Sequence, residues 1–211
     1  MGVPERRERE KELRRELIQE AAKRVFLTKG FMGATIDEIA REAEVSIGSI
    51  YLHFAGKEDL YASLNLSTIS AFEGAAAQII AYRDKGAEEK LDLTWQTMHR
   101  VFCSDPVGLR GLLHTQVEGS FQLLSPQMME ALNTSGKNAL HKLASILEEG
   151  MNEGVFVRDD PIVLADALWA MFTGLVIWEE AKRMTDTRKD HLKASLDKAY
   201  AVFKKGLKGQ T

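Results

Sequence analysis

The segment of residues 35–60 constrains the fold of this chain more strongly than any other part of the sequence. Thr35 stands just before a short run of apolar residues at helical spacing, and Glu38 follows it by three positions. A threonine and a glutamate at this spacing form a capping box, in which each side chain bonds to the backbone amide of the other residue. Ser46 is a second N-cap residue, so the segment predicts two short helices in close succession.

The connection between these two helices is tight. It contains only Glu44 and Val45, and Ala40 provides a small side chain where the helices must cross closely. A turn of three or four residues between two steeply crossed helices predicts a helix-turn-helix. Ile50 and Phe54 are expected to point inward from the second helix, which leaves its other face free to contact a partner.

Helical spacing of apolar residues continues through the rest of the chain, and no segment is convincing as a strand. We therefore predict an all-α fold of about nine helices, with a three-helix head at residues 1–56 and a larger helical domain at residues 57–211. A break in the seventh helix is expected near residues 133–136, where asparagine and glycine occur. The helices are expected at about residues 11–28, 36–43, 47–54, 57–82, 87–102, 107–124, 127–150, 161–184 and 188–205.

Composition excludes several classes of function. The net charge is −3 and residues 1–60 are close to neutral, so charge alone gives no support for nucleic-acid binding. The single cysteine, Cys103, rules out an internal disulfide framework and a cysteine-rich zinc site. The most apolar segment, residues 162–178, contains Asp166 and is short for a membrane span. Because the N-terminus is charged and lacks an apolar signal region, we expect a cytoplasmic protein with no membrane partner. No metal or cofactor is expected, since the sequence has no cluster of metal ligands and no glycine-rich phosphate loop.

The helix-turn-helix segment resembles the signature of the tetracycline-repressor (TetR) family. The matching residues are Thr35, Ile39, Ala40, Ala43, Val45, Ser46, Gly48, Tyr51, His53, Phe54, Lys57, Glu58 and Leu60. The resemblance implies an all-helical homodimeric transcription regulator, with a DNA-binding head and a C-terminal domain for ligand binding and dimerisation. One departure is Glu44, which stands where such families commonly have glycine. If the turn requires a positive φ there, glutamate costs about 1 kcal/mol relative to glycine.

The second helix of the motif would enter the major groove of an operator. Gly48 would let the backbone approach a base, Ile47 could contact thymine methyl groups, and Ser49 could bond to either kind of base. The helix carries no arginine or asparagine, so direct reading of guanine or adenine is expected to be sparse, with DNA shape adding specificity. The expected DNA contacts are Thr35, Ser46, Ile47, Gly48, Ser49, Tyr51, Leu52, His53 and Lys57, with phosphate contacts for Tyr51 and His53 implied by the family.

Alternatives remain open for several of these residues. Ser46 could act only as a helix cap, Tyr51 could pack against the first helix, and Lys57 could be a solvated surface lysine. The charged tail of residues 1–9 is expected to be loose. Its arginines could form an arm that reaches DNA phosphates or a minor groove, but the alternating glutamates favour a solvated, frayed helix start.

The C-terminal domain is expected to supply the dimer contacts and the effector site. Two reading heads need a spacing of roughly 34 Å on a palindromic double-stranded operator, which a two-fold homodimer provides. Apolar stripes on the last two helices predict a four-helix dimer interface through Leu168, Phe172, Leu175, Leu196, Tyr200 and Phe203, unless both stripes face their own core. A small hydrophobic effector is expected to contact Trp95, His99, Phe102, Phe121, Met128, Trp169 and Thr173, although each could be an ordinary core residue.

Three functions are therefore compared. A ligand-responsive repressor accounts for the motif and for the apolar, aromatic character of the C-terminal helices. A helical enzyme would need a nucleophile with a base or a cluster of metal ligands, and the sequence offers no catalytic group in such a pattern. A helical adaptor that has lost DNA binding is supported only by Glu44 and by the neutral charge of the head.

Overall fold

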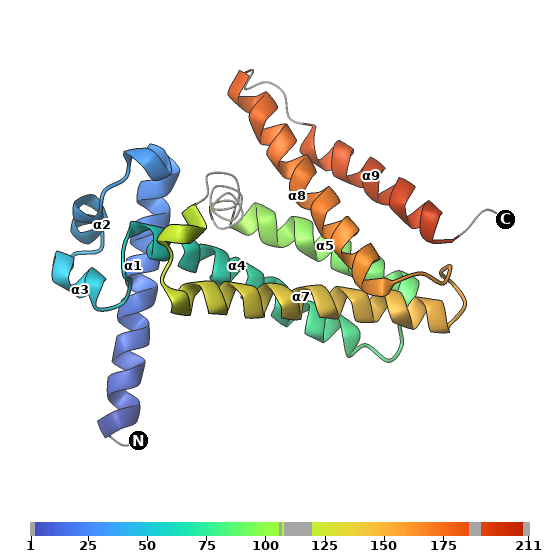
Figure 1. Cartoon of the computed structure of the whole chain (residues 1–211), viewed down its shortest axis with the longest axis horizontal. Helices are drawn as coiled ribbons and strands as arrows, with labels where there is room; N and C mark the ends of the chain where they lie inside the picture. Colours follow the sequence, from blue (N-terminus) through green and yellow to red (C-terminus); the bar gives the residue numbers. More distant parts are fainter. Residues whose placement is uncertain (1–2, 106, 108–119, 186–190, 209–211) are drawn as a thin grey trace. The chain divides into compact units, whose positions relative to one another are not determined.

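The structure, a computed structural model, describes residues 3–105, 107, 120–185 and 191–208. These residues form eight α-helices and one 3-10 helix, with no strand among them, which confirms the all-α fold (Figure 1). The helices are α1 (Val3–Gly33), α2 (Ile36–Glu42), α3 (Ile47–Tyr51), α4 (Lys57–Ile80), α5 (Ala87–Ser104), η1 (Ser120–Leu123), α7 (Pro126–Asn152), α8 (Pro161–Thr185) and α9 (Leu192–Leu207).

The structure differs from the sequence prediction in two helices and leaves a third mostly undescribed. α1 begins at Val3, so the expected loose tail is helical. α7 continues through residues 133–136 without the expected break, because one glycine in a helix costs only about 1 kcal/mol and packing along the helix outweighs that cost. Most of the helix expected at residues 107–124 lies outside the described residues.

The chain divides into two compact units. As far as residues are described, the first unit contains Met1–Thr68 and Asp105–Asn133, and the second contains Ile69–Ser104 and Thr134–Thr211. The domain boundary was expected after residue 56, immediately before α4 begins. In the structure, the first half of α4 belongs to the same compact unit as the head. α4 and α7 each begin in the first unit and end in the second.

The core of the first unit forms where α1, α2, α3 and the start of α4 meet. Its fully buried aliphatic side chains each contribute about 1.5–3 kcal/mol through loss of water contact. The ring of Phe31 adds to this core, with its centroid 4.9 Å from that of Tyr61. The core comprises Ile18, Ala21, Ala22, Phe26, Ala34, Ile39, Ala40, Ala43, Ile50, Phe54, Leu60, Tyr61, Leu64 and Val107.

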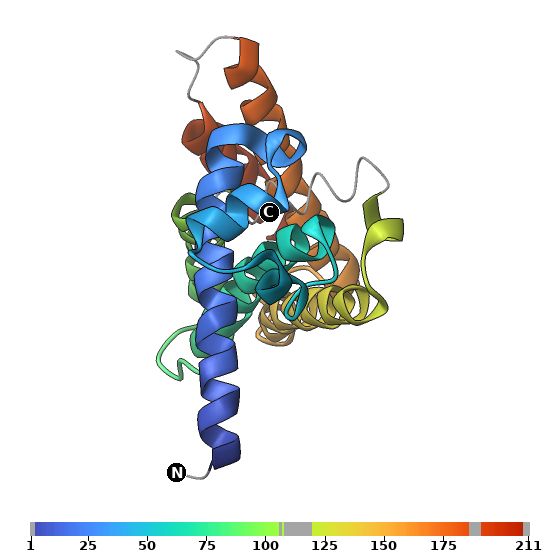
Figure 2. The same ribbon diagram turned by 90° about the vertical axis from the view of Figure 1, so that its left-hand side faces the viewer.

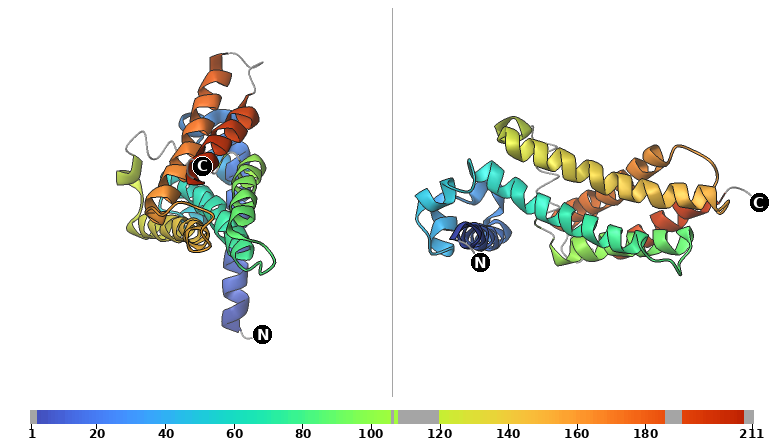
Figure 3. Two further views of the ribbon diagram at one scale, coloured as in Figure 1. Left: turned by 90° about the vertical axis from the view of Figure 1, so that its right-hand side faces the viewer. Right: turned by 90° about the horizontal axis from the view of Figure 1, so that it is seen from below.

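Aromatic stacking and ion pairs hold the second unit together. Trp95 of α5 stacks on Tyr200 of α9 with centroids 4.8 Å apart, and it meets Phe172 of α8 edge-on at 5.5 Å. The Tyr200 hydroxyl donates to Asp92 at 2.6 Å, and Lys204 bonds both oxygens of the same carboxylate. In the parts of α4 and α7 that belong to this unit, which run side by side in Figure 3, Lys142 pairs with Glu73 at 2.8 Å.

α8 leaves one apolar face uncovered. Asp160 caps this helix by accepting bonds from the amides of Ile162 and Val163, as the Asp-Pro start signal predicts. Its segment Pro161–Glu179 is apolar enough to meet the length and hydropathy criteria for a membrane span, yet only 22% of it is buried. The exposed face carries Val163, Ala167, Ala170, Gly174, Ile177 and Trp178, at helical spacing. We call these six residues the α8 outer face.

Candidate nucleic-acid interface

The two helix caps predicted from sequence define the helix-turn-helix. The Thr35 side chain accepts a bond from the Glu38 amide at 3.3 Å, and the Glu38 carboxylate accepts one from the Thr35 amide at 3.2 Å. Ser46 Oγ accepts a bond from the Ser49 amide at 3.1 Å and starts α3. These bonds satisfy orphan amides at both helix starts and fix the direction in which α3 leaves the turn.

The turn keeps its geometry despite the glutamate. Glu44 has a φ of 54°, the only positive φ of a non-glycine residue in the described part of the chain. The amide of Val45 donates to the carbonyl of Ala40 at 2.9 Å, which closes the turn after α2. The expected strain at Glu44 is therefore present, and the turn tolerates it.

Replacing Glu44 by glycine is expected to raise the free energy of unfolding by about 1 kcal/mol, because glycine adopts a positive φ without a Cβ clash. Denaturant titration of the full chain would measure this change. Glu44→Ala removes the same carboxylate but keeps Cβ, so it should give no comparable gain. An equal gain in both variants would attribute the effect to the side chain and contradict the role of φ.

α3 buries one face and offers the other to solvent. Ile50 is fully buried, whereas Ile47, Tyr51 and Leu52 have exposed fractions of 42%, 55% and 80%. Gly48 lies on the same open face, and an added Cβ there would meet nothing closer than 3.9 Å. In Figure 2 the head faces the viewer, and α2 and α3 lie against the upper part of α1. Large apolar side chains left exposed on a short, firmly capped helix indicate a surface that contacts a partner.

Two of the three acidic residues of α2 form ion pairs with α1. Glu42 meets Arg24 of α1 at 2.6 Å, and Glu38 meets Lys29 of the same helix. The bond from Lys29 is the main reason that the pKa of Glu38 lies below its usual value. Glu38 and Glu42 are therefore neutralised by basic residues of the head itself.

Lys57 has contacts that the sequence did not reveal. Its Nζ donates to the carbonyl oxygens of Phe31 at 3.0 Å and Ala34 at 3.1 Å, and it lies 4.5 Å from the centroid of the Phe31 ring. These bonds tie the α1–α2 connection to the start of α4. A phosphate contact by Lys57 would have to share the ammonium group with this structural role, so replacing Lys57 would test folding as much as DNA binding.

His53 lies at the end of α3, beside a hollow between that helix and α1. Its Nδ1 is buried without a hydrogen-bond partner. Burial, followed by the positive charges of Lys11, Arg15 and Arg14, lowers the pKa of His53 below its usual value, so the ring is mostly neutral near pH 7. The hollow has a volume of about 790 Å³ and is lined by Glu10, Lys11, Leu13, Arg14, Leu17, Ala43, Glu44, Val45, Leu52 and His53.

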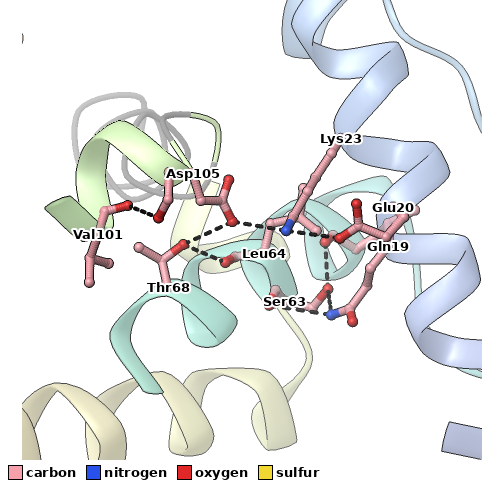
Figure 4. Close-up of polar contacts among 10 residues, drawn as sticks. Gln19, Glu20, Lys23, Ser63, Leu64, Thr68, Val101 and Asp105 are labelled. Atoms are coloured by element: carbon pink, nitrogen blue, oxygen red, sulfur yellow. Dashed lines mark hydrogen bonds and ion pairs between the residues drawn. The ribbon is translucent and has the colours of Figure 1, made fainter. Parts of the chain in front are cut away.

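A polar network joins α1 to α4 and to the residue that follows α5 (Figure 4). Lys23 pairs with Asp105 at 2.9 Å, and Thr68 donates to the same carboxylate oxygen at 3.3 Å. Gln19 donates to Ser63 Oγ at 2.8 Å one turn earlier along both helices. Because Asp105 is the residue at which the chain re-enters the first unit, this network fixes that entry point against the head.

The residues expected to bind an effector lie in different environments. Trp95 and Phe102 are buried, and both meet Phe172 edge-on. Thr173 bonds the carbonyl of Trp169, and His99 lies 3.5 Å from Cys103 Sγ. Met128 is buried in the first unit, and the side chain of Phe121 lies outside the described residues. These contacts do not gather the seven residues into one described pocket.

The sequence analysis missed Asn65 of α4. This residue is 1% exposed, and neither the nitrogen nor the oxygen of its side-chain amide has a hydrogen-bond partner. A buried amide with unused donors and acceptor is costly, so Asn65 is a candidate polar anchor for a ligand. The only signal in the sequence was an asparagine between two leucines, Leu64 and Leu66.

The residues expected at a dimer interface are mostly used inside their own subunit. Leu168, Phe172 and Leu196 are buried, and the Tyr200 hydroxyl is bonded to Asp92. Leu175 and Phe203 are half-buried. Leu168, Phe172 and Leu196 therefore pack inside their own subunit, as in the alternative left open, whereas a dimer contact through the partly exposed Leu175, Tyr200 and Phe203 stays a prediction. The surface that α8 leaves for a partner is the α8 outer face.

Comparison with known proteins places this geometry in context. Residues 18–64 match the family model described as bacterial regulatory proteins, tetR family. The chain is 32% identical over 168 residues to the A-factor receptor protein of Streptomyces griseus, covering 78% of this chain and 54% of that protein. It is 22% identical over 161 residues to the transcriptional repressor NemR of Escherichia coli, covering 76% of this chain and 80% of that one.

A solved structure shares the fold. The tetR-family regulator PfmR of Thermus thermophilus superimposes with a TM-score of 0.70 at 20% identity, over 92% of this chain and 98% of that chain. The match to the A-factor receptor spans only 54% of that protein's length, so the two chains are comparable over about half of the larger one. Family and fold thus agree with the helix-turn-helix built by Thr35, Ser46 and the turn at Glu44.

Proposed function

The chain belongs to the tetR family of bacterial regulatory proteins, and from this membership we propose that it is a ligand-responsive DNA-binding transcriptional regulator of the cytoplasm. It acts as a repressor that binds a palindromic operator as a homodimer and is released by a small hydrophobic effector. Two relatives support the two halves of this proposal: one is named a receptor and the other a transcriptional repressor.

The exposed face of α3 is the single observation that carries the proposal. A five-residue helix is too short to be stable alone, so the Ser46 cap and the buried Ile50 hold it in place. Gly48 and Ile47 occupy the outer side of its first turn, where a recognition helix contacts base edges. Tyr51, which is exposed on the same helix, is the proposed contact to the phosphate backbone.

The test is binding of the purified full chain to the DNA upstream of its own gene. Binding is measured by fluorescence anisotropy at one fixed salt concentration. Random DNA of the same length is the control. Tight binding to the upstream DNA that exceeds binding to random DNA supports a regulator. Equal, weak binding to both would favour the adaptor, in which the head serves another contact.

The effector site is proposed to include Asn65 as a polar anchor. An apolar pocket with one or a few polar groups binds ligands that are mostly hydrophobic and carry a single hydrogen-bonding group. The unpartnered Asn65 amide offers two donors and an acceptor for such a group. Met128, which is buried in the same unit as Asn65, stays a proposed apolar contact of this effector.

Replacing Asn65 by leucine is expected to raise the free energy of unfolding by about 1–3 kcal/mol, because an unpaired buried amide is exchanged for an apolar group of similar size. Thermal and denaturant unfolding of the ligand-free chain would measure it. Asn65→Asp, which introduces an unpaired buried charge, should lower stability instead. A loss of stability in Asn65→Leu would contradict the proposal, since the amide would then have a partner in the free protein.

Regulation is proposed to work through a shift between two conformations. The effector binds more tightly to the conformation in which the spacing of the two heads does not fit the operator. Operator affinity can fall by as much as the difference between the effector's binding free energies for the two conformations. α4 is the proposed lever, because it begins at Lys57 in the head and continues into the second unit. The Lys23–Asp105–Thr68 network is a second proposed link, since it fixes the end of the α5 connection to the head.

A further inference from the structure

The first turns of α1 carry a basic stripe that continues the buried face of the same helix. Arg7, Lys11 and Arg14 follow one another at spacings of four and three residues, which places them on one side of α1. Four residues further on, the same side carries Ile18, which is fully buried against the head, and Val25 continues it. The stripe therefore projects from the side of α1 on which α2 and α3 pack.

The acidic and basic residues that alternate along the start of the sequence lie on different sides of α1. Glu5, Glu12 and Glu16 follow one another at spacings of seven and four residues and lie on the opposite side of α1 from Arg7. Two glutamates border the stripe: Glu10 is paired with Arg6 at 2.8 Å, and Glu8 lies 3.8 Å from Lys11. The alternating glutamates, which suggested a merely solvated tail, thus leave one side of the helix basic.

The stripe borders the open end of α3. Lys11 and Arg14 line the hollow beside Leu52 and His53, together with the acidic Glu10 and Glu44. Lys11, Arg15 and Arg14 also contribute to the lowered pKa of His53, so their positive charge acts at the end of this helix. The stripe therefore places positive charge on α1 directly beside the end of α3.

The first turns of α1 have no packing of their own. Residues 4–14 are all exposed, and in Figures 1 and 2 this part of α1 extends beyond α2 and α3. Pairs such as Arg6–Glu10 and Glu12–Arg15 contribute only about 0.2–0.5 kcal/mol each to helix formation. Such pairs stabilise an exposed helix only weakly. A polyanion that binds along this part of α1 would stabilise it further.

We propose that Arg7, Lys11 and Arg14 form a second DNA-binding surface, which contacts the sugar-phosphate backbone of duplex DNA next to the base pairs met by α3. This inference rests on the proposed function. At a rise of 1.5 Å per residue the stripe is about 10 Å long, and each strand of duplex DNA carries one phosphate per 3.4 Å of its axis, so the stripe faces several phosphates. These contacts add affinity without reading sequence.

Single variants of the full chain test this surface through the salt dependence of operator affinity. Each phosphate contact that is lost should reduce the slope of log affinity against log salt by about 0.9 per subunit. Arg7→Ala and Arg14→Ala are expected to show this change between 50 and 200 mM KCl in anisotropy titrations. The ratio of affinities for the operator and for an operator with a changed base should stay the same.

Arg9→Ala is the matched control, because Arg9 lies on the acidic side of α1 and its loss changes net charge equally. Its slope should equal that of the wild-type chain. Slopes that are unchanged in Arg7→Ala and Arg14→Ala, or reduced equally in Arg9→Ala, would overturn the second surface while leaving the regulator in place. Failure of the wild-type chain to prefer operator DNA would overturn the proposed function instead.

Discussion

Replacing Gly48 by glutamate is expected to reduce operator affinity by about a hundredfold, or about 3 kcal/mol, while the protein stays folded. Gly48 lies on the exposed face of α3, in the first turn after the Ser46 cap. A glutamate there would place bulk and a negative charge against the bases and phosphates of the major groove. In the free head the new side chain finds room, since nothing lies within 3.9 Å of an added Cβ.

The free energy of unfolding should stay the same or rise slightly in Gly48→Glu, because glycine is a poor residue inside a helix. Gly136→Glu is the matched control: Gly136 lies within α7, and no atom lies within 4 Å of an added Cβ. Anisotropy titrations and thermal unfolding of both variants would be compared with the wild-type chain. Full operator binding by Gly48→Glu would show that α3 is not the helix that enters the groove.

Replacing Ala170 by glutamate is expected to convert the proposed homodimer to a monomer at micromolar concentration. Ala170 lies in the middle of the α8 outer face, between Ala167 and Gly174. Small residues allow two helices to approach closely, and a carboxylate buried there without a partner costs about 3–5 kcal/mol. Two-fold symmetry places the change in both subunits, which increases the cost.

Sedimentation or light scattering would measure this change in mass, and circular dichroism would check that helicity is kept. Operator affinity should fall steeply as well, because one head alone makes half the contacts. Ala77→Glu provides the matched control, since Ala77 is an exposed helical alanine on α4. A dimer that survives Ala170→Glu, or a wild-type chain that is monomeric, would exclude the α8 outer face as the interface.

The helix starts and stops were predictable from the sequence because they depend on neighbouring residues. The Thr35–Glu38 capping box and the Ser46 cap are both confirmed. Asp160 caps α8 just before Pro161, and Gly30 interrupts α1 near its end with a φ of 67°. The positive φ of Glu44 followed from the family pattern of the turn. Each of these features is fixed within a few residues of chain, where local hydrogen bonds and backbone sterics decide the conformation.

Only the tertiary structure decided which helix faces are buried and which partners the charged side chains contact. Apolar residues lie around most of α8, so spacing could not tell the buried Leu168 from the exposed Ala170. Lys57 meets the carbonyl of Phe31 only because packing brings together residues 26 positions apart. The basic stripe at Arg7 depends on α1 extending to Val3, whereas the alternating charges suggested a loose tail. The sequence by itself determined the helix-turn-helix, because its signals are local, while its partner surfaces depend on long-range packing that no local pattern encodes.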